Sequence, residues 1–226
     1  ILNELGIQTS FNNNTITVLP KAKIDKTHFT IESDWSSASY YYAIVALSPL
    51  GTKITLSSYK QNSLQGDAVL AEIYTSFGVT TVQTETGITL CKEQHNYNSI
   101  RLNLNNAPDI AQTIAVTCFG LGVGCNLYGL HTLKIKETDR LEALRKELAK
   151  LGASIITSDS GLILSSATKI KNNISIKTYQ DHRMAMAFAP LALKTTLIIE
   201  EAEVVSKSYP TFWSDIESIG FLIDEQ

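Results

Sequence analysis

The chain has 226 residues, of which 44% are hydrophobic and 18% are charged, and its net charge is −3. This composition is typical of a globular protein with one extensive core, and it excludes an intrinsically disordered chain. The Lys and Arg residues form no long run, which disfavours nucleic acid as a partner, and no apolar stretch has the length of a transmembrane helix, which disfavours a membrane partner.

The first 32 residues are interpreted as the end of a preceding domain. The segment from Ile1 to Phe11 is typical of the last turns of a helix that lead into a strand, and no methionine precedes it. We therefore expect residues 1–32 to be the tail of an upstream domain and residues 33–226 to form a C-terminal domain of three repeat units. The missing N-terminal domain of the same protein is then one expected partner.

Four similar segments recur along the chain, each with a helix-ending glycine, a short apolar strand and a polar turn. Their glycines are Gly6, Gly78, Gly152 and Gly220, which are 72, 74 and 68 residues apart. A glycine after a helix adopts the left-handed conformation that ends it. The turn residues after the strands favour hairpins, so the sequence predicts a structural repeat with this period.

Two further sets of residues keep the same period and begin helices. Asp34, Asp109 and Asp181 precede apolar helices, and Asp67, Asp139 and Thr211 precede amphipathic ones. Short polar side chains at these positions predict N-caps, which satisfy free backbone N–H groups at the helix start. Asp67 in particular is predicted to be such a cap.

The order of these elements predicts the fold class. We expect an α/β protein of the α+β type, with repeated βαβαββ units related by pseudo-threefold symmetry. The apolar helices would lie inside, and the sheets and amphipathic helices would lie outside. The third unit stops after "FLIDEQ", and we expect its missing strand to come from the start of the full-length chain.

Cations gather at several predicted helix starts, where the helix dipole disfavours them. Lys136 and Arg140 flank one start, His182 and Arg183 lie at a second, and Lys207 precedes a third. Basic side chains and helix N-termini together can bind phosphate or carboxylate groups. Because these helix starts lie at equivalent ends of the repeat units, we predict that they meet in a single anion-binding site at one end of the domain.

Three cysteines, Cys91, Cys118 and Cys125, lack the spacing of a metal site or a disulfide framework. All three lie in apolar segments and are predicted to be reduced core thiols. Reduced thiols are usual in a cytoplasmic protein, which is the location we expect.

Several motifs resemble one family in order and spacing. They are "SDWSSASYYYAIVAL", "QNSLQGD", "APDIAQTIA", "KIKETDRLEALRKELAKLGA", "YQDHRMAMAFAPLAL" and "SKSYPTFW". Together they resemble the C-terminal part of the 5-enolpyruvylshikimate-3-phosphate synthases, a family of enolpyruvyl transferases. The resemblance implies one domain of a two-domain inside-out barrel. It also implies transfer of the carboxyvinyl group of phosphoenolpyruvate to shikimate 3-phosphate in the pathway to aromatic amino acids, with no metal or organic cofactor.

The resemblance also implies roles for particular residues. Arg140, Arg183 and Lys207 match phosphoenolpyruvate ligands, and guanidinium groups suit a ligand that carries a phosphate and a carboxylate. Lys136 matches a contact to shikimate 3-phosphate that can also stabilise the tetrahedral intermediate. Asp109 matches the aspartate that binds the shikimate hydroxyls and accepts a proton.

Glu137, His182 and Thr132 complete the expected site. Glu137 matches the proton donor or shuttle of the family, yet two neighbouring cations should lower its pKa and favour a base. The division of acid and base roles between Asp109 and Glu137 therefore stays open. His182 matches a histidine near the phosphate, although a lone His at a helix start is more often structural. Thr132 stands where the family often has an asparagine that contacts substrate.

Two alternatives compete with this reading. A UDP-N-acetylglucosamine enolpyruvyl transferase would share the fold but needs an accessible cysteine loop, which the apolar surroundings of the cysteines disfavour. A noncatalytic binding module of the same fold is disfavoured by the joint presence of Asp109, Glu137, Arg140 and Arg183. Because half of the family's cleft lies in the other domain, this chain alone is expected to be inactive.

Overall fold

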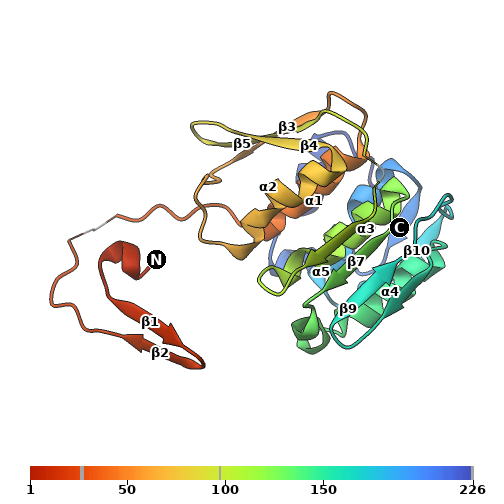
Figure 1. The fold of residues 1–226 in the computed structure, drawn as a ribbon. Coiled ribbons are helices and arrows are strands. Elements are labelled where there is room, and N and C mark those ends of the chain that lie inside the picture. Colours follow the sequence, from red (N-terminus) through yellow and green to blue (C-terminus); the bar gives the residue numbers. More distant parts are fainter. Residues whose placement is uncertain (26–27, 97, 225–226) are drawn as a thin grey trace. The chain divides into compact units, whose positions relative to one another are not determined.

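The computed structural model describes residues 1–25, 28–96 and 98–224, and it divides the chain into two compact units, Ile1–Glu32 and Ser33–Gln226. The first unit consists of a short 3-10 helix η1 (Asn3–Leu5) and the strands β1 (Thr9–Asn12) and β2 (Thr15–Val18). These strands form the predicted hairpin, in which Asn12 faces Thr15 across a two-residue turn (Figure 1).

The first repeat of the second unit has one main helix and a three-stranded sheet. Its elements are α1 (Trp35–Leu47), β3 (Lys53–Ser57), η2 (Gly66–Val69), α2 (Leu70–Ile73), η3 (Tyr74–Phe77), β4 (Val79–Gln83) and β5 (Gly87–Lys92). The strand order is β3-β5-β4, and both pairs are antiparallel.

The second repeat has the full set of predicted elements. They are β6 (Ile100–Asn103), η4 (Pro108–Ile110), α3 (Ala111–Leu121), β7 (Cys125–Tyr128), η5 (His131–Ile135), α4 (Arg140–Lys150), β8 (Ile155–Thr157) and β9 (Gly161–Leu164). The strand order is β6-β7-β9-β8, with β6 parallel to β7 and the other pairs antiparallel.

The third repeat has a parallel strand pair and four helical segments among the described residues. Its elements are β10 (Ile174–Ile176), α5 (His182–Phe188), η6 (Ala189–Leu193), β11 (Leu197–Ile199), η7 (Ala202–Lys207) and α6 (Phe212–Ser218). Strands β10 and β11 pair in parallel, as β6 and β7 do. Residues 221–224 follow α6 without forming a strand.

The three repeats share an order of strands and helices, but they are not equally complete. The second has both the parallel pair and the hairpin, the first has only the hairpin strands and β3, and the third has only the parallel pair. The strand expected before α1 is not formed among the described residues. Ser33 N donates instead to Ser58 O at 2.8 Å, just after β3.

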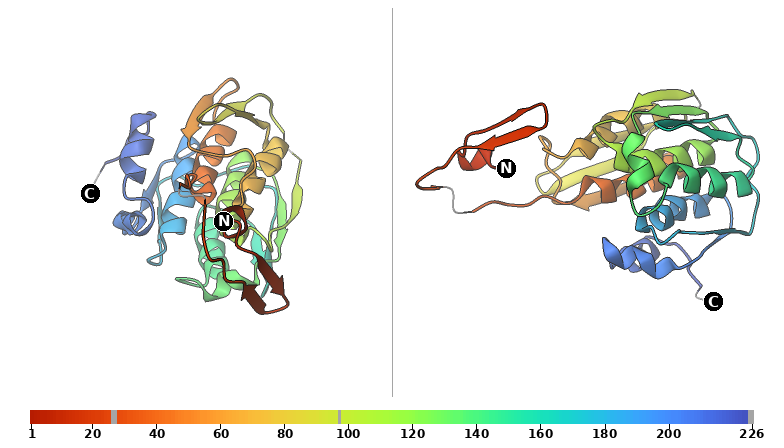
Figure 2. Two further views of the ribbon diagram at one scale, coloured as in Figure 1. Left: turned by 90° about the vertical axis from the view of Figure 1, so that its left-hand side faces the viewer. Right: turned by 90° about the horizontal axis from the view of Figure 1, so that it is seen from below.

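Apolar helices form the interior of the second unit, as predicted. Helix α1 packs against α3, α3 packs against α5, and η6, which continues α5, packs against α1. The sheets lie outside these helices (Figures 1 and 2). Tyr40 and Tyr42 of α1 are fully buried in this core. Helix α4 buries Leu141, Leu144 and Leu148 on one face, so the α/β fold class read from the sequence is confirmed.

Most predicted helix boundaries are confirmed. Gly6, Gly78, Gly152 and Gly220 all have positive φ angles. At Gly78 a Cβ atom would also lie 1.9 Å from Gln94 O, so close approach requires glycine there as well. Asp34, Asp139 and Asp181 accept hydrogen bonds from backbone N–H groups at the starts of α1, α4 and α5.

The predicted side-chain N-caps are wrong at Asp67, Asp109 and Thr211. Asp109 lies inside η4, and the Thr211 side chain accepts no backbone N–H bond at the start of α6. At Asp67 a tertiary contact explains the difference. Gln65 precedes the helical segment, and Asp67 lies inside η2. Its carboxylate accepts a hydrogen bond from Ser36 Oγ instead. Because this carboxylate is largely buried, desolvation raises the pKa of Asp67. A tertiary partner thus replaces the local N–H partner that the sequence pattern suggested.

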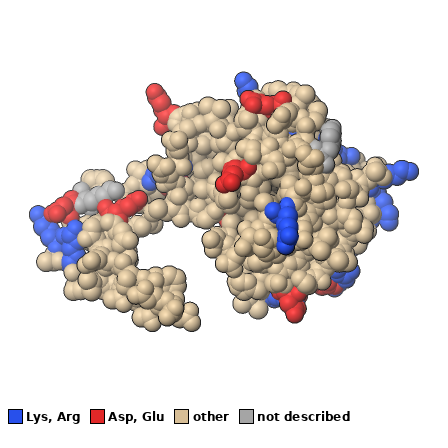
Figure 3. Space-filling model, in the orientation of Figure 1, with Lys and Arg blue, Asp and Glu red and all other residues tan. Residues whose placement is uncertain are grey.

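Three further properties of the fold concern helix length, surface charge and the cysteines. Within the described residues, every helix is too short or too polar to span a bilayer. On the face of the second unit that Figure 3 shows, most of the surface is uncharged, and the Lys, Arg, Asp and Glu side chains lie mainly near its edges. Cys91, Cys118 and Cys125 are free and buried, as predicted.

Candidate functional site

The candidate site forms where the second and third repeats begin their helices. Arg140 is the first residue of α4, Asp181 precedes α5, and Asp109 lies in η4 at the start of α3. Because α3 packs against both α4 and α5, these helix starts meet. The structure therefore brings together residues from three distant segments.

Arg140 is the centre of this cluster. Its side chain is only 2% exposed. Its Nε atom donates to Asp181 Oδ2 at 2.6 Å, and its Nη1 atom donates to Asp109 Oδ1 at 3.0 Å. Its Nη2 atom donates to Glu137 Oε2. A buried guanidinium that contacts carboxylates from three segments is not a solvated surface ion pair.

Asp109 forms ion pairs with three basic side chains. Its Oδ1 atom lies 3.3 Å from Lys136 Nζ as well as 3.0 Å from Arg140, and its Oδ2 atom accepts from Arg183 Nη2 at 3.2 Å. Burial alone would raise the pKa of Asp109, but the charges of Arg183, Lys136 and Arg140 outweigh it and lower this pKa. Asp109 is therefore ionised at neutral pH.

Glu137 also has a lowered pKa, as its neighbours predict. Burial acts to raise it, whereas a backbone hydrogen bond and the nearby charges of Arg140, His182 and Arg183 lower it. The side chain is 39% exposed, so it lies at the solvent side of the cluster. Both carboxylates are thus ready to accept a proton rather than to donate one.

Three further predicted residues lie at the margin of the cluster. Lys207 is exposed, and its Nζ donates to Gln180 O at 2.8 Å, one residue before Asp181. The pKa of His182 is lowered by burial, and its Nδ1 atom has no hydrogen-bond partner among the described residues. Thr132 lies in η5, which packs against η4, and its buried hydroxyl is likewise without a partner in that part of the chain.

Asp181 is a site residue that the sequence reasoning missed. It was expected only to cap α5, and it does accept from Arg183 N at 2.9 Å. Its side chain is fully buried, however, and also holds Nε of Arg140. An aspartate directly before two basic residues and an apolar helix is the available signal, because a buried carboxylate needs a cation.

Acid titration tests the charge arrangement around Asp109. A lowered carboxyl pKa contributes stability that is present above the ordinary value of 3.8, and this contribution is lost as the pH falls through the lowered pKa. We expect the full-length protein to lose more of its unfolding free energy between about pH 5 and pH 2 than the Asp109→Asn variant does. Urea titrations at each pH measure this, and parallel pH profiles would contradict the arrangement.

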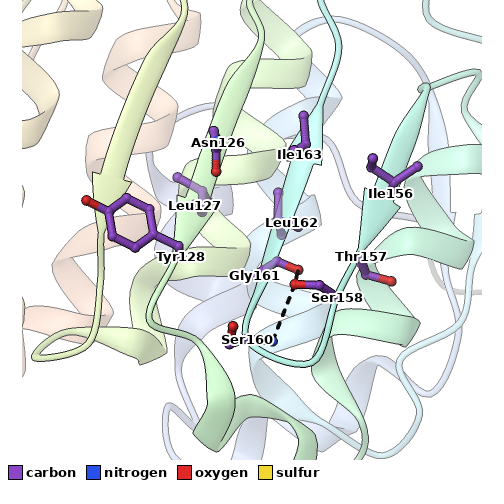
Figure 4. A pocket seen from close by; sticks show the side chains of 10 residues that line it. All are labelled: Asn126, Leu127, Tyr128, Ile156, Thr157, Ser158, Ser160, Gly161, Leu162 and Ile163. Atoms are coloured by element: carbon purple, nitrogen blue, oxygen red, sulfur yellow. Dashed lines mark hydrogen bonds between the residues drawn. The ribbon is translucent and has the colours of Figure 1, made fainter.

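A separate surface depression is not this site. It has a volume of about 150 Å³ and lies on β7, β8 and β9, between Tyr128, Ile156 and Ile163 (Figure 4). None of its ten lining residues is charged, and none belongs to the Arg140 cluster. Within the described residues, no group of three or more His, Cys, Asp or Glu side chains is placed to hold a metal ion.

Comparisons with known proteins point to one family. Residues 1–216 match the family model of EPSP synthase (3-phosphoshikimate 1-carboxyvinyltransferase). A 3-phosphoshikimate 1-carboxyvinyltransferase of Bacteroides fragilis is 41% identical over 224 residues, which are 98% of this chain and 54% of that relative. One from Methanocaldococcus jannaschii is 33% identical over 99% of this chain and 52% of its own length. The chain thus spans about half the length of these relatives.

Solved structures share the fold. An EPSP synthase from Acinetobacter baumannii has a TM-score of 0.83 and 22% identity, covering 100% of this chain and 54% of that one. The enolpyruvyl transferase NikO from Streptomyces tendae has a TM-score of 0.65 and 12% identity, covering 97% and 51%. At these identities the likeness concerns the fold.

Proposed function

Because the chain belongs to the EPSP synthase (3-phosphoshikimate 1-carboxyvinyltransferase) family, we propose that the full-length protein transfers the enolpyruvyl group of phosphoenolpyruvate to shikimate 3-phosphate and releases phosphate. The observation that supports this most is the Arg140 cluster, where Asp109 and Glu137 lie beside Lys136 and Arg183. This set combines anion-binding groups with two ionised carboxylates. We further propose that the enzyme acts in the cytoplasm.

The cleft would be completed by a second domain. Residues 33–226 supply one wall, and we assign residues 1–32 to the end of the upstream domain that supplies the other. The compact division after Glu32 supports this assignment. Since the matched relatives are about twice as long as this chain, the chain holds half of the proposed site.

Arg140 would present one edge of its guanidinium to phosphoenolpyruvate. Asp181 is completely buried and holds the Nε edge, whereas Asp109 and Glu137 are 27% and 39% exposed on the Nη side. An anionic ligand can reach the Nη atoms by displacing Glu137, the most exposed of the three carboxylates. Arg183 would then bind part of the remaining charge through its planar guanidinium, which suits phosphate and carboxylate groups, and Lys207 would add a single ammonium charge.

The chemistry needs two proton transfers in opposite directions. The hydroxyl oxygen of shikimate 3-phosphate bonds to C2 of phosphoenolpyruvate while C3 gains a proton. Phosphate then leaves C2 as C3 loses a proton. We assign the hydroxyl proton to Asp109, which passes it on to the departing phosphate. We assign the C3 proton to Glu137, which donates it in the addition and takes it back in the elimination. A bound phosphate would raise the pKa of Glu137, which would protonate it before the addition. Lys136 would stabilise the charged intermediate.

Turnover of the full-length protein tests the proposed function. We expect phosphate release only when phosphoenolpyruvate and shikimate 3-phosphate are both present. Residues 1–226 alone should release no more phosphate than their Lys136→Ala variant does, because domain closure and half of the ligand contacts are missing. A full-length protein that binds both compounds without turnover would instead be a binding module. Activity with UDP-N-acetylglucosamine would overturn the proposal, and the buried cysteines argue against it.

A further inference from the structure

A strained turn precedes the start of α5. Asp181 N donates to Thr178 O at 3.0 Å, and the two central residues, Tyr179 and Gln180, have φ angles of 56° and 59°. Two successive positive φ angles are typical of a type I′ turn, which normally contains Asn and Gly. Larger side chains disfavour this conformation, so the surrounding structure must hold the turn.

A buried carboxylate outside the Arg140 cluster holds this turn. Glu147 of α4 has a fully buried side chain. Its Oε1 atom accepts from Tyr179 Oη at 2.7 Å, and its Oε2 atom accepts from Lys177 N at 3.0 Å and from Lys150 Nζ. Burial and the adjacent carboxylate raise the pKa of Tyr179, so the phenol stays protonated and donates.

Helix α4 therefore forms hydrogen bonds at both ends of the turn. Arg140 and Glu147 are seven residues apart, which is close to two helical turns, so both side chains leave the same face. Glu147 binds Lys177 N and Tyr179 Oη, and Arg140 binds Asp181 just after the turn. Strand β10, which leads into the turn, lies beside α4 (Figure 1). Loss of the hydrogen bonds from Lys177 and Tyr179 to Glu147 would make the backbone of the turn, which places Asp181, more mobile.

The same turn places three groups of the proposed phosphoenolpyruvate site. Asp181 orients Arg140 through the 2.6 Å bond to Nε. The amide of Arg183 donates to Asp181 Oδ1, and Lys207 Nζ donates to Gln180 O. None of these contacts involves Glu147 directly, and the turn connects the residues that Glu147 binds to Asp181, Gln180 and Arg183.

We propose that Glu147 is a positioning residue, which acts through Tyr179 and the turn 178–181 to hold Arg140, Arg183 and Lys207 for phosphoenolpyruvate. The proposal rests on the proposed function. It gives a role in the active site to a carboxylate that lies two helical turns from the Arg140 cluster and touches none of the reacting groups.

Kinetics of the full-length protein test this role with Glu147→Gln and Tyr179→Phe. Each variant removes a contact to the turn and leaves every proposed ligand in place. We expect KM for phosphoenolpyruvate to rise about tenfold, and KM for shikimate 3-phosphate to change by less than about twofold. Glu142→Gln is the matched control, because Glu142 lies on the same helix and pairs only with Arg145 and Lys146 among the described residues.

Hydrogen exchange supplies a readout that does not depend on turnover. We expect the amide of Asp181 to exchange about tenfold faster in Glu147→Gln than in the parent protein. Gln180→Gly, which relieves the left-handed backbone, should restore part of the protection and part of the KM in the double variant. If the parent protein is inactive, only the proposed function is contradicted. The exchange rate of the Asp181 amide would still show whether the contacts of Glu147 stabilise the turn.

The proposal is overturned if Glu147→Gln lowers the urea midpoint but leaves both the Asp181 exchange rate and KM for phosphoenolpyruvate unchanged. Equal rises in KM for both substrates would overturn it too, because they would indicate a general loss of structure. If Glu147→Gln does not fold, the same measurements on Tyr179→Phe test the proposal, because this variant keeps the ion pair between Glu147 and Lys150.

Discussion

Replacing Asp109 with Asn in the full-length protein is expected to lower kcat by about 10²–10⁴-fold. Asparagine keeps the shape of the side chain and can still accept a hydrogen bond from Arg140 or Arg183. It cannot take the hydroxyl proton of the acceptor substrate, and it removes the charge that faces Lys136 at 3.3 Å. Steady-state phosphate release with both substrates saturating measures the loss directly.

Asp159→Asn is the control for this variant. Asp159 also pairs with a lysine, Lys134, but its side chain is 98% exposed, and exposed pairs contribute little. Its kcat should equal that of the parent protein. If Asp109→Asn kept its kcat and only raised KM for shikimate 3-phosphate, Asp109 would bind the substrate without taking a proton.

Replacing Arg140 with Met is expected to lower the free energy of unfolding of the full-length protein by about 3–5 kcal/mol at neutral pH. The buried carboxylate of Asp181 would then lose its guanidinium partner, and the partly exposed Asp109 and Glu137 would lose the same contact. Activity should also be lost, because the proposed ligand for phosphoenolpyruvate is gone. Urea unfolding and turnover assays measure the two effects.

The stability loss of Arg140→Met should shrink as the pH falls. Without Arg140, the pKa values of Asp109 and Glu137 would rise, so acid would neutralise the uncompensated charges sooner. Arg145→Met is the control, since Arg145 lies on the same helix and pairs with Glu142 at the surface. An equal urea midpoint for both variants would show that the buried cluster does not stabilise the fold.

The periodic features of the sequence predicted most of the fold. Helix-ending glycines such as Gly78 and Gly152 depend on local backbone conformation, which neighbouring residues do not easily override. The wrong prediction at Asp67 shows the limit of this reasoning. A short polar residue before an apolar run suits an N-cap, but Ser36, 31 residues away, binds its carboxylate instead.

The sequence by itself determined the repeat, the helix boundaries and the family, because these depend on local conformation and on motifs read along the chain. It also placed Lys136, Glu137, Arg140 and Arg183 among the candidates. Only the tertiary structure decided that Asp181 completes the coordination of Arg140 and that Glu147 holds the turn before α5. Each is a buried carboxylate with a partner 30 or more residues away in the sequence, Arg140 for Asp181 and Tyr179 for Glu147. Only chain packing identifies these partners, which help to offset the desolvation of the carboxylates.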